Sequence, residues 1–329
     1  MSSLRKLITA VVSVGVVGAL LTGTAVAPAH AANKKIAFVM GAESDPFFQA
    51  MKVGAEAAAK ANNIDLIWQG DPSEYSPATQ IPVVDQVLAQ KPDALVLIPT
   101  DPTALQASVA KAKAAGIPVI NVDTRVNDLT DVLSFITGDN ADGGAKAADA
   151  LAKAIKYTKG KTYQVVVGLT SATATTNVAR LDGFSKQIAK KYPGIKIVDK
   201  AYSQSQPAKA NTNVSNWLTK YPKLAGIFAI DGTNAAGAAA AIQAKGLKGK
   251  VALVGYDAYK ANVDLIGKGV FTALVAQDPA AEAKLAIEYL VKYFAGQTSG
   301  IKKEVVIPNV VLSKSSSAAD LKKYTYVQK

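Results

Sequence analysis

The chain contains no cysteine, and its only histidine is His30. Without cysteine there can be no disulfide framework, no thiol nucleophile, no thiolate metal site and no lipid attached to a cysteine. A Ser-His-Asp or Cys-His mechanism needs an imidazole that accepts the proton of the nucleophile, and a zinc site needs His or Cys ligands. His30 itself lies in a segment that we predict is removed. We therefore expect no bound metal, no cofactor and no enzyme of these classes.

Charge is also scarce, because Asp, Glu, Lys and Arg make up only 19% of the residues, with a net charge of +12. The basic excess comes as scattered lysines and doublets such as Lys34-Lys35. A nucleic-acid surface needs a basic stripe interleaved with aromatic residues, and this sequence has none. We expect solvated lysine faces and no nucleic-acid partner. Weak attraction to an anionic cell envelope is the alternative.

Residues 1–31 have the three parts of a secretory signal peptide. Arg5 and Lys6 form its positive start, an apolar stretch follows around residues 11–21, and residues 29–31 (Ala-His-Ala) form an A-x-A cleavage site. The apolar stretch is shorter than the roughly 20 residues that a membrane span needs, so a retained anchor is the less favoured reading. We expect an exported protein that acts in the periplasm or outside the cell envelope after cleavage near Ala31.

Hydrophobic residues make up 49% of the chain and form short runs that alternate with longer helical patterns. This alternation is typical of βα units and parallel sheets. We predict strands over residues 36–40, 65–69, 94–98, 118–122, 163–168, 195–201, 226–230, 251–255 and 272–276. We predict helices over residues 46–62, 81–90, 104–115, 140–156, 175–191, 206–220, 234–245, 259–268 and 279–294.

Two stretches of the chain repeat each other. Residues 98–101 (Ile-Pro-Thr-Asp) precede an Ala-rich helix and a strand that leads to Asp123, and residues 229–233 (Ala-Ile-Asp-Gly-Thr) precede a second Ala-rich helix and a strand that leads to Asp257. The repeat predicts the fold class α/β, with two doubly wound parallel-sheet lobes. Ligands of such sheets bind outside the carboxyl ends of the strands, so two facing lobes would enclose a ligand between them.

Acidic and amide side chains stand at these strand ends. Asp123 ends the fourth strand, Asp231 and Asp257 follow strands of the second half, and Gln277 ends the last predicted strand. A carboxylate accepts two hydroxyl hydrogen bonds at once, which suits vicinal diols, and Arg125 adds a complementary donor. Turn chemistry is the alternative for each single aspartate, and an exposed loop position is the alternative for Arg125.

Residues 45–48 (Asp-Pro-Phe-Phe) follow the first predicted strand. Adjacent residues do not share a helical face, so Phe47 and Phe48 cannot both point inward, and we expect at least one to cover the apolar face of a sugar ring. Packing of both rings in the core is the alternative. Asp45 is the expected N-cap of the first helix, with Pro46 at its first position, and the same carboxylate can face the ligand.

Two residues of the helix over 175–191 complete the candidate site. Asn177 stands at its start and Arg180 lies one turn along it, with helix capping and a structural salt bridge as the respective alternatives. Four acidic groups against one or two arginines would repel carboxylates and phosphates. A neutral polyhydroxy ligand fits this balance, and a cationic ligand remains open because aromatic rings and carboxylates also form cages for ammonium groups.

Residues 34–311 resemble the type I periplasmic solute-binding proteins of ABC transporters, in the branch of the ribose-binding protein. The matching motifs are Ile36-Ala37-Phe38-Val39, Asp45-Pro46-Phe47-Phe48, Ala115-Gly116-Ile117-Pro118-Val119-Ile120, Gly138-Asp139-Asn140 with Gly143-Gly144, Arg180 with Gly183-Phe184, Val254-Gly255-Tyr256-Asp257 and Ala276-Gln277. The resemblance implies two lobes joined by a three-crossover hinge and capture of a small sugar by closure. It implies lobes over residues 32–138 plus 278–306 and over residues 139–277 plus 307–329.

By position, the ligand residues of that family fall on Asp45, Phe47, Phe48, Asp123, Asp231, Tyr256, Asp257 and Gln277. The chain departs from the ribose binders where Thr124 precedes Arg125, where residues 176–178 replace an arginine, and where Asp231 replaces asparagine. We therefore expect a pentose, a hexose or a linear polyol rather than ribose itself. Residues 68–75 resemble the related autoinducer-2-binding branch more than the ribose branch.

The resemblance implies a binding protein that delivers its ligand to ABC permease subunits and acts without catalysis. We expect a monomer, because a closing cleft needs no symmetric partner. A sensory role, in which the closed form meets a receptor, is compatible with it. A sugar-responsive transcription regulator shares the fold but needs a DNA-binding helix pair where this chain has an export signal. A glycosidase that works with two carboxylates is the remaining alternative.

Overall fold

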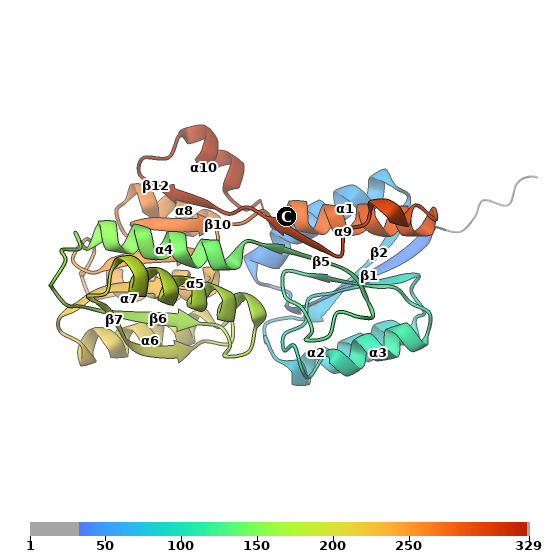
Figure 1. The fold of residues 1–329 in the computed structure, drawn as a ribbon, viewed down its shortest axis with the longest axis horizontal. Coiled ribbons are helices and arrows are strands. Elements are labelled where there is room, and N and C mark those ends of the chain that lie inside the picture. Colours follow the sequence, from blue (N-terminus) through green and yellow to red (C-terminus); the bar gives the residue numbers. More distant parts are fainter. Residues whose placement is uncertain (1–32, 328–329) are drawn as a thin grey trace, which may run out of the picture. The chain divides into compact units, whose positions relative to one another are not determined.

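The computed structural model describes residues 33–327, which form two six-stranded sheets flanked by helices (Figure 1). The first sheet has the order β11-β5-β4-β3-β1-β2 and the second the order β12-β10-β9-β8-β6-β7. The strands of the first sheet are β1 (Lys34–Ala42), β2 (Ile64–Asp71), β3 (Ala94–Leu97), β4 (Val119–Val122), β5 (Val132–Gly138) and β11 (Glu304–Ile307). Those of the second are β6 (Tyr163–Leu169), β7 (Ile195–Tyr202), β8 (Leu224–Ala229), β9 (Ala252–Tyr256), β10 (Ala273–Ala276) and β12 (Val310–Ser313).

Helices pack on these sheets as the βα pattern requires. With the first sheet lie α1 (Pro46–Ala61), α2 (Pro77–Ala89), α3 (Gln106–Ala114) and α9 (Pro279–Phe294). With the second lie α4 (Asn140–Ala154), α5 (Thr175–Lys191), α6 (Pro207–Lys220), α7 (Gly232–Ala244) and α8 (Lys260–Gly267). A 3₁₀ turn spans Thr298–Gly300, and α10 (Ala318–Tyr324) follows β12. We call each sheet with its helices the first and the second lobe.

The predicted fold class is confirmed: both sheets are parallel throughout, except that β12 runs antiparallel to β10. The sequence pattern does not predict β5, β11, β12 or α10. β5 is an apolar run directly before a helix, and the edge strands β11 and β12 have only four residues each, with partly exposed faces. α2 begins at Pro77 rather than at residue 81, because Ser76 caps it by accepting a hydrogen bond from the Ala78 N–H.

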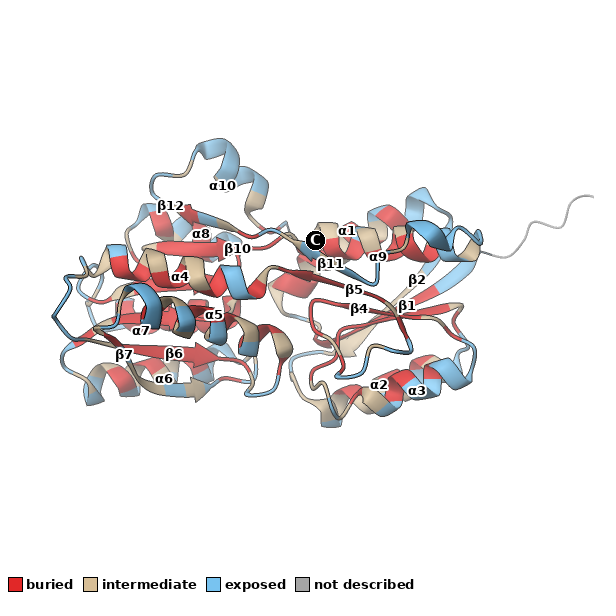
Figure 2. Cartoon of the chain, in the orientation of Figure 1, coloured by how far each residue is buried: buried red, intermediate tan, exposed pale blue. Residues whose placement is uncertain are grey.

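The chain passes between the lobes three times. β5 leads into α4, β10 leads into α9, and β11 leads through residues 308–309 into β12. Each of the three crossovers follows the carboxyl end of a strand. The strands themselves form the buried core of each lobe, whereas the helices expose one side (Figure 2).

Within residues 33–327, no helix is long and apolar enough to cross a membrane. The predicted signal peptide over residues 1–31 lies outside the described residues.

Candidate functional site

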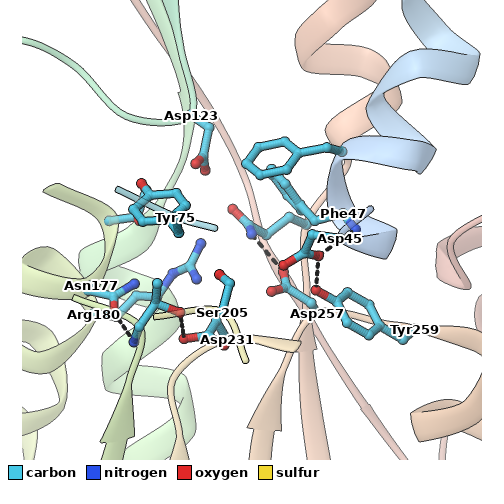
Figure 3. A pocket seen from close by; sticks show the side chains of 14 residues that line it. Asp45, Phe47, Tyr75, Asp123, Asn177, Arg180, Ser205, Asp231, Asp257 and Tyr259 are labelled. Atoms are coloured by element: carbon cyan, nitrogen blue, oxygen red, sulfur yellow. Dashed lines mark hydrogen bonds between the residues drawn. The ribbon is translucent and has the colours of Figure 1, made fainter. Parts of the chain in front are cut away.

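One pocket gathers side chains from both lobes, and we call it the interlobe pocket (Figure 3). Its lining residues stand at strand ends and at the helix starts that follow: Asp45, Phe47, Phe48, Tyr75, Asp123, Thr170, Thr176, Asn177, Arg180, Ser205, Asp231, Asp257, Tyr259 and Gln277. All the site residues predicted from the sequence are among them except Arg125 and Tyr256.

Asp257 is a carboxylate that the protein itself holds in place. It follows β9 with a φ of 65°, and its N–H donates to the Val275 carbonyl at 2.7 Å. Its Oδ1 accepts hydrogen bonds from Gln277 Nε2 at 2.7 Å and from Tyr326 Oη at 3.0 Å, and its Oδ2 accepts one from the Gly232 N–H at 2.9 Å. The buried carboxylate therefore has a fixed orientation, and Oδ2 keeps a lone pair for a ligand hydroxyl.

Asp123 occupies the matching place after β4 but lacks such partners. Its φ is 61° and its N–H donates to the Ile136 carbonyl at 2.8 Å, while its buried Oδ1 has no hydrogen-bond partner. Figure 3 shows the carboxylate apart from the other acids, pointing into the pocket. Burial raises the pKa of Asp123 to about 7, although the Arg180 guanidinium favours the ionised form.

A second buried carboxyl group, that of Glu282, is affected by the charge of Asp123. Glu282 in α9 is fully buried, and neither of its carboxyl oxygens has a partner. Burial, and then the charge of Asp123, raise its pKa well above the usual range. Burial therefore favours the neutral form of Glu282, and the negative charge of Asp123 favours it further.

Asp45 links the two lobes. Its Oδ1 caps α1 by accepting a hydrogen bond from the Phe47 N–H at 3.0 Å, and it also accepts one from Tyr259 Oη. Its Oδ2 accepts a hydrogen bond from Thr233 Oγ1 at 3.0 Å. Burial raises the pKa of Asp45 to about 6, against the effect of the Tyr259 and Phe47 donors. Asp45 thus caps its helix, as predicted, and also joins the first lobe to residues of the second.

Asp231 belongs to a network in the wall that the second lobe contributes. It caps α7 through the Asn234 N–H at 2.9 Å, and its Oδ2 accepts a hydrogen bond from Thr170 Oγ1 at 2.8 Å. Asn177 Oδ1 in turn accepts a hydrogen bond from the Thr170 N–H at 2.7 Å. Burial raises the pKa of Asp231. The network fixes the loop after β6 against the starts of α5 and α7.

Arg180 is the cation of the interlobe pocket. Its Nε donates to Asn140 Oδ1 at 2.7 Å, and its Nη1 donates to the Ile230 carbonyl at 3.0 Å. The buried guanidinium faces Asp257, Asp123 and Asp231, and these carboxylates, with Tyr256, raise its pKa despite the opposing effect of burial. Arg180 therefore lines the pocket and also interacts with buried carboxylates, so the two roles expected from the sequence do not exclude each other.

Tyr256 lies beneath Arg180 rather than on the pocket surface. Its ring centroid is 3.8 Å from the Arg180 guanidinium carbon, a close cation–π contact. Its Oη accepts a hydrogen bond from Asn309 Nδ2 at 2.6 Å. Gly143 is required here, because a Cβ at this position would stand 1.9 Å from Tyr256 Oη. Tyr256 therefore supports the arginine and does not line the pocket.

Phe47 and Phe48 both line the interlobe pocket, and both are buried in the core. Their ring centroids are 5.4 Å apart with an interplanar angle of 76°. The expectation that the two rings cannot both point inward is therefore wrong: the edge-to-face pair is buried in the core and also forms part of the pocket wall.

Arg125 lies in a neighbouring groove instead of the interlobe pocket. Its N–H donates to Thr175 Oγ1 at 3.2 Å, and its guanidinium carbon is 5.9 Å from the ring centroid of Phe135. Among the residues predicted as cationic donors, only Arg180 faces the pocket.

Five lining residues are absent from the sequence prediction: Tyr75, Thr170, Thr176, Ser205 and Tyr259. Tyr75 and Ser205 lie in loops after β2 and β7, and Tyr259 immediately precedes α8. Such loop positions carry no periodicity, so no pattern indicates which of their side chains turn toward the pocket. Thr176 could have been predicted, because it is adjacent to Asn177 at the start of the same helix.

This arrangement is suited to holding a polyhydroxy molecule. Asp123 and Asp257 offer acceptors, Arg180 offers donors, and Phe47 with Phe48 offers an apolar wall. Among the residues that the structure describes, no group of three or more His, Cys, Asp or Glu side chains is arranged to hold a metal ion.

Comparison with known proteins gives the family. A model described as periplasmic binding protein domain matches residues 36–298. The D-ribose/D-allose-binding protein of Pseudomonas aeruginosa is 32% identical over 286 residues, which cover 84% of this chain and 87% of that protein. The xylitol-binding protein of Mycolicibacterium smegmatis is 28% identical over 276 residues, which cover 83% of this chain and 76% of that protein.

A solved structure agrees with these relatives. An ABC transporter solute-binding protein from Agrobacterium vitis, bound to α-D-tagatopyranose, superposes with a TM-score of 0.84 at 32% identity, covering 90% of this chain and 100% of that one. These relatives are binding proteins by name, in agreement with the expectation of a non-enzymatic receptor. The chain belongs to the periplasmic binding protein family, in its ribose-binding-like type I branch.

Proposed function

We propose that this chain is the extracytoplasmic substrate-binding component of an ABC transporter and that it captures a neutral monosaccharide or polyol in the interlobe pocket. One observation carries the proposal: carboxylates at the strand ends of both sheets meet an arginine and two phenyl rings in one pocket. Relatives named for ribose and allose or for xylitol, and one bound to tagatose, support this ligand class.

The charge of the interlobe pocket favours a neutral ligand over a cation. Burial raises the pKa values of Asp45 and Asp123 to about 6 and about 7, and that of Asp231 above its usual value. Each of these groups is therefore more easily neutral than an exposed aspartate, and Arg180 offsets a further negative charge. A cationic ligand would need the ionised carboxylates without this compensation.

The same geometry supports closure of the lobes over the ligand. We propose that the three crossovers act as the hinge, with the lobe boundaries predicted from the sequence. The hydrogen bonds from Thr233 and Tyr259 to Asp45 join the lobes in the closed arrangement. The closed form then docks on ABC permease subunits. A sensor that reads the same closed form is the second candidate partner.

The proposed site of action is outside the cytoplasm, after removal of residues 1–31. Mass spectrometry of the mature protein, purified as a monomer from the producing cell, is expected to give an amino terminus near Ala32. A retained first residue in the active protein would contradict this part of the proposal.

Thermal unfolding of the mature protein in the presence of candidate ligands tests the ligand class. The panel contains D-ribose, D-allose, D-tagatose, D-arabinose and xylitol, with spermidine, glycine betaine and amino acids as cationic and zwitterionic controls. A ligand that binds only the folded protein raises the melting temperature by mass action. We expect a shift from one or two sugars or polyols, and a smaller shift at the same ligand concentration in Asp123→Ala. A shift from spermidine alone would overturn the neutral-ligand assignment.

A further inference from the structure

The carboxyl-terminal segment returns to the back of the interlobe pocket. After β12 the chain forms α10, which has no buried residue, and then reaches Tyr326, whose side chain is only 6% exposed. The next residue, Val327, is 66% exposed. The structure thus buries one aromatic side chain of an otherwise superficial segment, and nothing in the sequence pattern accounts for it.

The Tyr326 hydroxyl connects two residues of the pocket. Its Oη donates to Asp257 Oδ1 at 3.0 Å and accepts a hydrogen bond from the Gln277 N–H at 3.3 Å. The Tyr326 N–H donates to the Ala258 carbonyl at 2.9 Å, which anchors the segment to the residue after Asp257. Gln277 Nε2 donates to the same Asp257 oxygen. The hydroxyl therefore completes a triangle of hydrogen bonds that orients the carboxylate.

The Tyr326 ring contacts the aromatic wall of the pocket. Its centroid is 6.1 Å from that of Phe47 in the first lobe and 6.0 Å from that of Tyr259 in the second lobe. Burial, and then the charge of Asp257, raise the pKa of Tyr326 well above its usual value. The phenol consequently stays protonated at neutral pH and remains a donor to Asp257.

We propose that Tyr326 is a positioning residue for the sugar site, whose hydroxyl fixes the Asp257 carboxylate and whose ring supports Phe47. The inference rests on the proposed function, because it assigns Asp257 to ligand hydroxyls. Its consequence is that the segment from Ala318 to Val327 helps to orient Asp257, which the two sheets alone do not fix.

A pair of Tyr→Phe variants tests the proposal. Tyr326→Phe keeps the ring and removes the hydroxyl, and Tyr324→Phe removes a hydroxyl two residues earlier, at the half-buried end of α10. Isothermal titration uses the panel sugar that binds the unaltered protein most tightly. We expect Tyr326→Phe to raise its Kd roughly tenfold, since the lost bond is to a charged group. Tyr324→Phe is expected to leave both Kd and the melting temperature of the ligand-free protein unchanged. Tyr326→Phe is expected to lower that melting temperature slightly, because the buried Gln277 N–H loses its acceptor.

A ligand-free measurement separates this inference from the proposed function. Amide hydrogen exchange at Gln277 is expected to accelerate in Tyr326→Phe, because its N–H loses its acceptor, and to stay unchanged in Tyr324→Phe. Unaltered exchange or an unaltered Kd in Tyr326→Phe would overturn the positioning role. If no panel member binds the unaltered protein, the proposed function fails, and exchange at Gln277 still decides whether Tyr326 orders this part of the pocket.

Discussion

Asp123 and Asp257 occupy matching places in the two lobes, yet their side chains have opposite surroundings. Asp123 follows β4 and Asp257 follows β9, and these strands hold the same place in the order of their sheets. The backbone of each aspartate is in the left-handed region of φ, and each N–H donates to a carbonyl of the neighbouring strand. Asp257 accepts three hydrogen bonds from the protein, whereas Oδ1 of Asp123 accepts none. The repeated fold therefore fixes the positions of the two carboxylates, and other residues determine how many hydrogen bonds each carboxylate accepts from the protein.

The reason for the difference lies on the adjacent strands. The Asp123 N–H meets the carbonyl of Ile136, and the Asp257 N–H meets that of Val275. Two residues beyond Val275, Gln277 supplies the amide that holds Asp257, but two residues beyond Ile136 the chain has Gly138. A Cβ at Gly138 would stand 2.8 Å from Gln277 Oε1, so the first lobe has no room for a matching amide. One carboxylate is preorganised by the protein, and the other is left for the ligand to complete.

The largest effect that distinguishes the two aspartates is on stability. Asp257→Ala leaves the Gly232 N–H, the Gln277 amide and the Tyr326 hydroxyl without their acceptor. We expect it to lower the free energy of unfolding by about 3 kcal/mol, since a buried donor without a partner costs roughly 1–3 kcal/mol. Asp123→Ala removes a carboxyl with an unpaired oxygen and is expected to leave stability unchanged or slightly raised. Urea denaturation of both ligand-free variants at pH 7 gives the comparison, and equal losses would remove the distinction.

Ligand affinity, unlike stability, is expected to depend on Asp123. A ligand hydroxyl that satisfies Asp123 gains a hydrogen bond to a charged or partly charged group, which contributes about 1.5–3 kcal/mol. Asp123→Ala should therefore weaken sugar binding by about 2 kcal/mol while the protein keeps its melting temperature. Titration calorimetry with the panel sugar that binds best measures the loss. Asp131→Ala, at an exposed position in the loop before β5, is the matched control and should bind normally. Normal binding by Asp123→Ala would show that its carboxylate meets no ligand.

The same difference gives the ligand-free protein a pH-dependent stability. The folded-state pKa of Asp123 is about 7 and that of Asp45 about 6, both above the value of 3.8 for an unperturbed aspartate. Between about pH 4 and pH 7 the folded state therefore binds more protons than the unfolded state, so stability falls as pH rises, by up to about 1.4 kcal/mol per pH unit for each group. Denaturation midpoints at pH 4.5, 6 and 7.5 measure the slope.

Asp123→Asn is expected to flatten that slope without abolishing it, because Asp45 and Glu282 retain raised pKa values. Asp264→Asn, in an exposed pair with Lys260, serves as the control and should keep the full slope. A stability curve that rises from pH 4.5 to pH 7.5 in the unaltered protein would contradict the direction of both shifts.

The strand-end carboxylates were predictable because two simple rules meet at them. Apolar periodicity locates the strands, and ligands of doubly wound sheets bind at the carboxyl ends, so Asp123, Asp231 and Asp257 follow directly. Partners that depend on the path of a loop or a tail were not predictable. The folding of their segments alone brings Tyr259 to the pocket wall and Tyr326 to Asp257. The sequence therefore indicates which acids form the pocket but not which groups hold them.

The two arginines illustrate the same limit. Arg125 lies two residues after Asp123 and has the shorter path to the pocket along the chain, yet its side chain lies over Phe135 in another groove. Arg180 reaches the pocket because Asn140 of a different helix and the ring of Tyr256 fix its guanidinium. Contacts with residues distant in the sequence determine which arginine faces the pocket, and such contacts cannot be predicted from the pattern of a single sequence.

The smallest expected effects concern Asp45, whose partners lie across the two lobes. Tyr259→Phe and Thr233→Val each remove one donor to Asp45 and leave the Asp123 and Asp257 carboxylates intact. Each variant is expected to weaken sugar binding by about 1 kcal/mol, because closure gains one hydrogen bond fewer. Tyr202→Phe, at an exposed position of the second lobe, is the control.

Titration of the double variant Tyr259→Phe/Thr233→Val sharpens the result. Losses of affinity that add show that the two oxygens of Asp45 act independently. A loss in the double variant equal to that of one single variant shows that the two hydrogen bonds to Asp45 act together. Unchanged affinity in all three variants would mean that closure depends on the ligand's own contacts with the two aspartates, and not on Asp45.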